Sequence, residues 1–240
     1  MADRPMRRRS FLQGAGIAST AAAAALSGGL AGCAQSGESN APPQAASTPN
    51  EPLLTLTLSE AAFLGAVYDT FIPADQYSPS GTDCGLVVYI DRQLAGAWGN
   101  GARFYRAGPF LQGKPEQGYQ LPLTPREYFA TGIAAANDWS RRTYGKDFDR
   151  LTTQQRDEAL HTMDAGKADF GDFNSKRFFE ILYQSAMEGF FADPIYGGNR
   201  NKASWKMVSY PGLPATYASK AEEYRGKKVN LPPQSIADLS

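Results

Sequence analysis

The chain has 240 residues, of which 42% are hydrophobic, and this is enough apolar material for one packed domain of ordinary size. Lys and Arg total 24, as do Asp and Glu, so no excess positive charge is available to drive nucleic-acid binding. The single histidine, His161, argues against Ser-His-Asp and Cys-His catalysis and against a His-rich metal site. The two cysteines, Cys33 and Cys84, are too few for a four-cysteine zinc or iron–sulfur site and lack the C-x-x-C-H spacing of a c-type haem attachment. We therefore predict no nucleic-acid partner and no catalytic, cofactor-binding or metal site in this chain.

Residues 1–32 have the composition of a removable export signal. Three arginines at 7–9 precede a weakly apolar run of Gly and Ala. The pattern at 8–12 resembles the twin-arginine motif R-R-x-F-L, and its matching residues are Arg8, Arg9, Phe11 and Leu12. A membrane-spanning helix needs about 20 strongly apolar residues, and the glycines and serines of this run make it too polar. An uncleaved anchor is the alternative to a cleaved twin-arginine signal.

The apolar run is followed by Leu30-Ala31-Gly32-Cys33, which resembles a bacterial lipobox and favours cleavage before Cys33 with lipidation of its sulfur over ordinary signal cleavage. Residues 33–52 are rich in Ser, Ala, Gln, Asn and Pro, which is typical of a disordered linker. Such a linker spans roughly 25 Å, enough to hold a tethered domain clear of lipid headgroups. Acylation of Cys33 would leave Cys84 either available to another chain or buried as an inert thiol.

Residues 53–240 are predicted to form one helical domain. Thr57 and Glu60 have the spacing of a capping box, and apolar residues follow at helical spacing until Pro73. Thr124, Pro125 and Glu127 begin a later helix in the same manner. Five helices are expected, at about 58–72, 86–98, 125–144, 152–166 and 175–189. The fold class is therefore a small, irregular all-α domain of about five helices with long loops rich in Gly, Pro and aromatic residues.

The segment from Glu188 to Gly212 is predicted to be a long loop. Asp193-Pro194 and the following glycines favour turns, yet the segment is dense in aromatic residues. Such a loop either covers its own core or forms a protein interface. The predicted partner interface consists of Cys84, Phe191, Asp193, Tyr196, Gly197, Gly198, Asn199, Arg200, Trp205 and Tyr210.

This segment, together with the twin-arginine start, resembles the gluconate 2-dehydrogenase subunit 3 family. The matching residues are the stretches 188–194, 196–200, 205–206 and 210–212. The order of elements is similar over roughly residues 58–217. Departures from the family pattern are Asn201, where an acidic residue is usual, and Ser204 and Ser209, where glycine is usual.

The resemblance implies a supporting role in an enzyme complex. Family members are small subunits of periplasmic FAD-dependent sugar and polyol dehydrogenases, so the implied partners are a GMC-type large subunit that binds FAD and a multi-haem cytochrome c subunit that carries haem c. The small subunit is implied to stabilise the folded flavoprotein and escort it through the Tat translocase. The expected location is the periplasm, at the cytoplasmic membrane, attached through the partner or through a lipid on Cys33.

An alternative is a free-standing periplasmic lipoprotein that binds a small ligand in a helical pocket. The acids at Asp164, Asp169 and Asp172 lack the spacing of a calcium loop and are expected to be solvated loop residues. His161 is expected on a helix surface.

Overall fold

The structure is a computed structural model that describes residues 51–111, 113–114, 117–214 and 216–239. The predicted export residues Arg8, Arg9, Phe11 and Leu12 and the predicted lipidation site Cys33 lie outside these described residues. Within them there is no strand, and the prediction of an all-α fold is confirmed.

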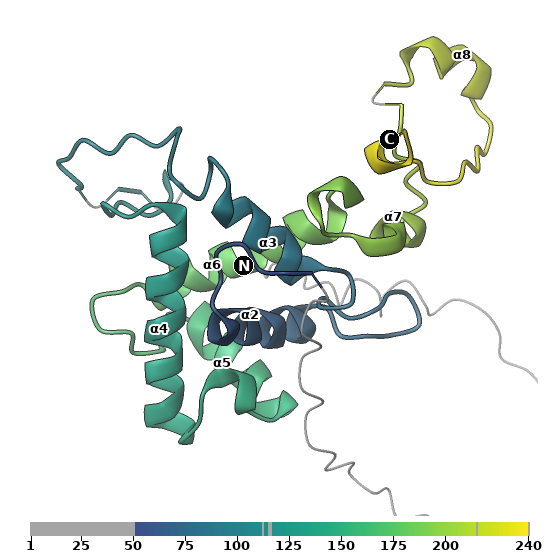
Figure 1. The fold of residues 1–240 in the computed structure, drawn as a ribbon. Helices are drawn as coiled ribbons and strands as arrows, with labels where there is room; N and C mark the ends of the chain where they lie inside the picture. Colours follow the sequence, from purple (N-terminus) through teal and green to yellow (C-terminus); the bar gives the residue numbers. More distant parts are fainter. Residues whose placement is uncertain (1–50, 112, 115–116, 215, 240) are drawn as a thin grey trace, which may run out of the picture. The chain divides into compact units, whose positions relative to one another are not determined.

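The five predicted helices are all present (Figure 1). They are α2 (Leu58–Phe71), α3 (Leu86–Ala95), α4 (Pro125–Tyr144), α5 (Thr153–Asp164) and α6 (Ser175–Phe191). Two short helices follow, α7 (Ala203–Met207) and α8 (Ala221–Tyr224). The remaining helical turns are η2 (Phe148–Arg150), η3 (Pro194–Tyr196), η4 (Arg200–Lys202), η5 (Ala218–Lys220) and η6 (Ile236–Leu239).

Local capping explains why the long helices begin where they do. Thr57, Thr124 and Thr152 each form a complete capping box with the residue three positions later. Asn174 caps α6, since its side-chain oxygen accepts a hydrogen bond from the backbone N–H of Arg177 at 2.8 Å. These caps satisfy backbone N–H groups that have no partner within the helix.

One helix boundary was predicted wrongly. The second helix was expected to reach Trp98, but α3 ends at Ala95, and the N–H of Gly96 donates to the carbonyl groups of Arg92 and Gln93. The chain then turns, so Trp98 lies outside the helix and packs edge-on against Phe129 at 6.4 Å between ring centroids.

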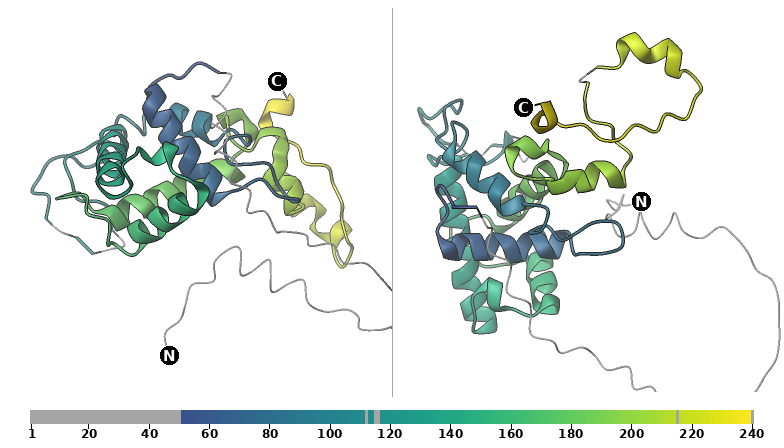
Figure 2. Two further views of the ribbon diagram at one scale, coloured as in Figure 1. Left: turned by 90° about the horizontal axis from the view of Figure 1, so that it is seen from below. Right: turned by 45° about the vertical axis from the view of Figure 1, so that its right-hand side comes forward.

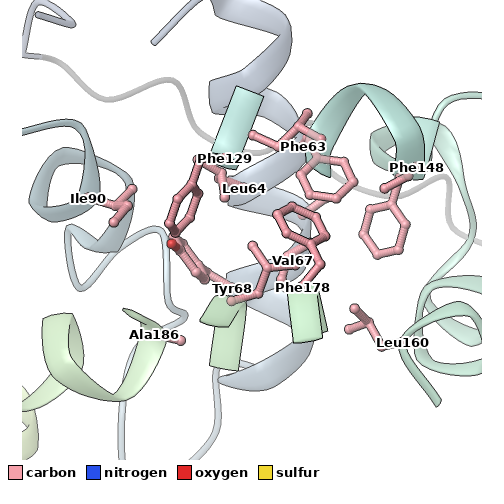
Figure 3. Close-up of a cluster of buried hydrophobic side chains, with 14 of the residues drawn as sticks. Phe63, Leu64, Val67, Tyr68, Ile90, Phe129, Phe148, Leu160, Phe178 and Ala186 are labelled. Atoms are coloured by element: carbon pink, nitrogen blue, oxygen red, sulfur yellow. The ribbon is translucent and has the colours of Figure 1, made fainter. Parts of the chain in front are cut away.

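The core forms around α2, whose side chains face the other long helices (Figure 3). Phe63 of α2 lies between Phe148 and Phe178, with ring centroids 5.0 and 6.4 Å away. Tyr68 is fully buried, and its hydroxyl shares a hydrogen bond of 3.0 Å with Ser185 of α6. Burial of each such ring stabilises the fold by about 1.5–3 kcal/mol.

The long segment between α3 and α4 packs only partly against the helices. The ring of Tyr119 stacks on Tyr128 of α4 at 4.1 Å. Tyr105, by contrast, is 85% exposed. No described helix is both long enough and apolar enough to cross a lipid bilayer.

The C-terminal part contains an excursion, residues 213–234, that leaves the helices and returns to its starting point (Figure 2). Its base is closed by a parallel bridge between Gly212 and Gln234, and the N–H of Leu213 donates to the carbonyl of Gln234 at 3.0 Å. None of the described residues of the excursion is buried. The excursion therefore has no hydrophobic core of its own.

Candidate partner-binding site

The segment Glu188–Gly212, called the motif segment from here on, is not one long loop as predicted. Glu188 to Phe191 form the last turn of α6, and η3, η4 and α7 follow with only short connections between them. The prediction failed because each helical piece after α6 is only three to five residues long, too short to leave a periodic pattern.

Asn199 holds the centre of the motif segment together. It is fully buried, with a left-handed backbone at φ 45° and ψ 41° that asparagine tolerates better than most residues. Its side-chain NH2 donates to the carbonyl of Ala192 at 2.9 Å. Its side-chain oxygen accepts from the N–H and the hydroxyl of Ser204 at 3.0 and 2.8 Å. One side chain thus joins the end of α6 to the start of α7.

Glycines let the motif segment approach α3 and α6 closely. A Cβ atom at Gly198 would lie 2.2 Å from the carbonyl oxygen of Gly189, and one at Gly85 would lie 2.3 Å from that of Gly197. The N–H of Arg200 donates to the carbonyl of Cys84 at 3.0 Å. Gly197 and Gly198, which belong to the predicted interface, are buried and form this internal contact.

Trp205 was predicted as an interface anchor, but it is only 6% exposed. Its indole N–H donates to the carbonyl of Phe191 at 3.0 Å, and its ring meets Tyr210 edge-on at 5.1 Å. Trp205 therefore fixes α7 to the end of α6, and its contacts are internal.

Cys84 was also predicted at the partner interface, and its environment argues against that role. It is 1% exposed, and its thiol points to the carbonyl of Pro79 at 3.7 Å. Because the sulfur is covered by the fold, a disulfide to another chain would require the loop before α3 to open. The buried-thiol alternative fits this position.

The exposed part of the motif segment is mainly aromatic and aliphatic. Five large side chains on it are between 40% and 52% exposed, namely Phe191, Ile195, Tyr196, Val208 and Tyr210. Asp193 and Arg200 are half-buried beside them. Asp193 caps η3 by accepting from the N–H of Ile195 at 3.0 Å, and its second oxygen accepts from the N–H of Ile236 at 2.9 Å. The buried residues of the motif segment thus form a rigid base that holds these exposed apolar side chains in place.

An open hollow of about 420 Å³ lies between α3, the end of α6 and η3. Its lining residues are Tyr89, Gln93, Glu188, Phe191, Ala192, Asp193 and Tyr196. Partial burial, together with the charges of Glu188 and Tyr196, raises the pKa of Tyr89 to about 12. Tyr89 was missed by the sequence analysis because it lies about 100 residues before the motif segment and carries no local signal.

A strap ahead of α2, residues 51–56, is fastened beside the motif segment. The buried carboxylate of Asp91 accepts hydrogen bonds from three consecutive backbone N–H groups of the strap, at 2.6, 3.0 and 2.9 Å. Glu51 forms ion pairs with Arg92 of α3 and with Arg200 of the motif segment. Glu51 was assigned to the linker, but it is part of the folded domain. The signal that could have revealed the strap is an acid, Asp91, within an otherwise apolar helix face.

A second hollow, of about 470 Å³, lies along α5 and includes His161. The His161 ring is on the surface as expected, 3.7 Å from Asp157. Both hollows are open to solvent, whereas small-ligand sites enclose most of their ligand. The described residues contain no group of three His, Cys, Asp or Glu side chains that could hold a metal ion.

Searches of the curated proteins and of the solved structures found no significant match to the chain. A family model described as gluconate 2-dehydrogenase subunit 3 matches residues 59–212, from the start of α2 to the end of the motif segment. The match covers the long helices as well as the buried framework around Asn199. The chain therefore belongs to the gluconate 2-dehydrogenase subunit 3 family.

Proposed function

We propose that this chain is the non-catalytic small subunit of a complex whose catalytic subunit is an FAD-dependent dehydrogenase of the GMC type. The observation that carries the proposal is the division of the motif segment into a buried framework and an exposed apolar surface. Aromatic side chains held on a rigid base lose little entropy on binding, which is typical of interface hot spots. The exposed residues Phe191, Tyr196 and Tyr210 are the proposed docking contacts.

The proposal includes co-export of the folded flavoprotein. Arg8 and Arg9 would direct the chain to the Tat translocase, which carries folded cargo, and FAD would already be bound in the cytoplasm. A lipid on Cys33 or contact with a multi-haem cytochrome c subunit would hold the complex at the periplasmic side of the cytoplasmic membrane. FAD and haem c would reside in the partner subunits.

Docking is tested by co-expressing this chain, tagged at its C-terminus, with the flavoprotein subunit of the same organism. We expect FAD to co-elute with the wild-type chain in constant ratio, measured by absorbance at 450 nm. Tyr196→Ala combined with Tyr210→Ala should lower FAD recovery about tenfold or more, because hot-spot truncations cost about 2 kcal/mol or more each. Tyr105→Ala is the matched control, since Tyr105 is an exposed tyrosine outside the motif segment.

Trp205→Ala is not a docking test, because the buried indole supports the motif segment itself. Full FAD recovery with the double tyrosine variant would contradict docking through this surface. A wild-type chain that elutes without flavin would contradict the subunit role.

Export is tested separately with Arg8→Lys combined with Arg9→Lys. We expect the flavoprotein to remain in the cytoplasmic fraction when the chain carries this change. Normal periplasmic dehydrogenase activity in that strain would contradict the escort role and leave the docking role standing.

A further inference from the structure

The hollow beside η3 gathers negative charge that no described lining residue balances. Glu188 and Asp193 both line it, and its lining contains no Lys or Arg. Glu188 accepts a hydrogen bond from the side chain of Gln184 at 2.7 Å, and Asp193 accepts only backbone N–H groups. Among the described residues, the groups bonded to these two carboxylates are neutral, so they hold the carboxylates in place without balancing their charge.

The position of Glu188 on its helix adds to this imbalance. It lies in the last turn of α6, where the aligned backbone dipoles place partial negative charge, and that turn contains no basic residue. A carboxylate is destabilising at a helix C-terminus unless a cation lies close by. Arg92 lies beside Gly197 and Arg200 beside Gly85, and both are paired with Glu51.

Two tyrosine rings give the hollow a preference among cations. Tyr89 packs over Gly189, where a Cβ atom would lie 2.7 Å from the ring, and Tyr196, which is 52% exposed, also lines the hollow. Aromatic faces attract guanidinium and ammonium groups. Two carboxylates with aromatic neighbours suit an organic cation better than a metal ion, which takes more oxygen ligands.

We propose that this hollow receives an arginine or lysine side chain of the flavoprotein subunit. Glu188 pairs with the cationic group, Asp193 adds to the negative potential, and the rings of Tyr89 and Tyr196 flank the side chain. The proposal rests on the proposed function and names the chemistry of the partner's contact at this site. A carboxylate is unfavourable at the C-terminal end of α6, and a binding role accounts for the presence of Glu188 there.

The test measures the affinity between this chain and the flavoprotein subunit, each purified, at several NaCl concentrations. Glu188→Gln should weaken binding about tenfold or more at low salt, since a charge pair at an interface loses one partner. The same variant should show a smaller loss of affinity as NaCl increases, because fewer charges are screened. Glu180→Gln is the matched control and should stay within about twofold of wild type; Glu180 lies on the same helix, outside the hollow, and pairs with Arg177 at 2.7 Å.

A second pair of variants separates attraction to an aromatic face from simple apolar contact. Tyr196→Phe keeps the ring and should retain binding within about threefold, whereas Tyr196→Leu should lose about fivefold or more. Thermal unfolding of each free variant checks that the fold is intact.

The possible failures are distinguishable. Undiminished affinity of Glu188→Gln, or equal affinity of the Phe and Leu variants at position 196, would overturn the assignment of the hollow alone. A wild-type chain that forms no complex with the flavoprotein would overturn the proposed function and the assignment together.

Discussion

At the scale of single residues, the two serines that depart from the family pattern occupy opposite environments. Ser204 is buried, and both its N–H and its hydroxyl donate to Asn199. Ser209 is exposed and has a left-handed backbone at φ 55°. Glycine adopts that conformation without steric cost, whereas other residues pay about 1–2 kcal/mol.

Glycine should therefore have opposite effects at these two positions. Ser209→Gly should raise the free energy of unfolding by about 0.5 kcal/mol, since relief of strain exceeds the added chain entropy. Ser204→Gly should lower it by about 1–2 kcal/mol, because a buried hydrogen bond is lost within a helix. Urea unfolding of the two variants checks this, and changes of the same sign would contradict it.

The raised pKa of Tyr89 predicts a loss of stability in alkali. Its pKa in the folded chain is about 12, above the ordinary value of 10.0, chiefly because burial disfavours the phenolate. Tyr89 is neutral in the folded and the unfolded chain below pH 10, so its contribution to folding stability is complete there. Above pH 10 the unfolded chain ionises this tyrosine first, and the contribution is lost as the pH rises through 12. We expect a contribution of about 1 kcal/mol, less than the full linkage value because the ring is partly exposed.

Tyr89→Phe isolates this effect. Between pH 10 and 12 its free energy of unfolding should fall less steeply than that of the wild type, and its absorbance titration at 295 nm should lack one late-ionising tyrosine. Identical slopes in the two proteins would contradict the assignment of the shift to Tyr89.

At the scale of secondary-structure elements, the contact between α4 and α6 depends on a missing side chain. The ring of Phe178 lies on Gly132, where a Cβ atom would come within 2.3 Å of it. Alanine in a helix interior normally stabilises by about 0.5–1 kcal/mol relative to glycine. Here the overlap with the ring of Phe178 makes alanine destabilising relative to glycine.

Gly132→Ala should destabilise the fold by about 1–3 kcal/mol, the usual cost of overpacking a core. Thr131→Ala, at the neighbouring exposed position, should be neutral or slightly stabilising. Adding Phe178→Leu to Gly132→Ala should recover part of the loss, which a double-mutant cycle measures as coupling. A stabilising Gly132→Ala would show that the ring moves aside freely.

Elements with local signals were predictable from the sequence. The capping residues Thr57, Thr124 and Asn174 lie within three positions of the groups they bind, so the pattern itself indicates the helix start. The division of the motif segment into buried and exposed parts was not predictable. It depends on contacts such as Gly85 with Gly197, whose partners are more than 100 residues apart and which no spacing rule connects.

At the scale of the whole molecule, the residues after Leu213, which include most of the excursion and η6, contribute little to the fold. Among the described residues after Leu213, only Ser235 is buried. The contacts made there by the backbone N–H of Ile236 and the side chain of Asp238 are exposed and worth little.

Truncation after Leu213 should thus leave the free energy of unfolding within about 1 kcal/mol of the full chain and lower Tm by no more than about 4 °C. Differential scanning calorimetry measures both quantities. A drop of about 10 °C or more would mean that residues 214–240 support the helical core.

The strap at residues 51–56 determines how the fold carries mechanical force. A pull on the chain ahead of Glu51 reaches first the ion pairs with Arg92 and Arg200, and then the three N–H bonds to Asp91. These contacts share the tension and pass it into α3 and η4 before α2 can be peeled from the core. A chain held by its N-terminal end would therefore transmit that tension directly to α3, which frames one side of the hollow.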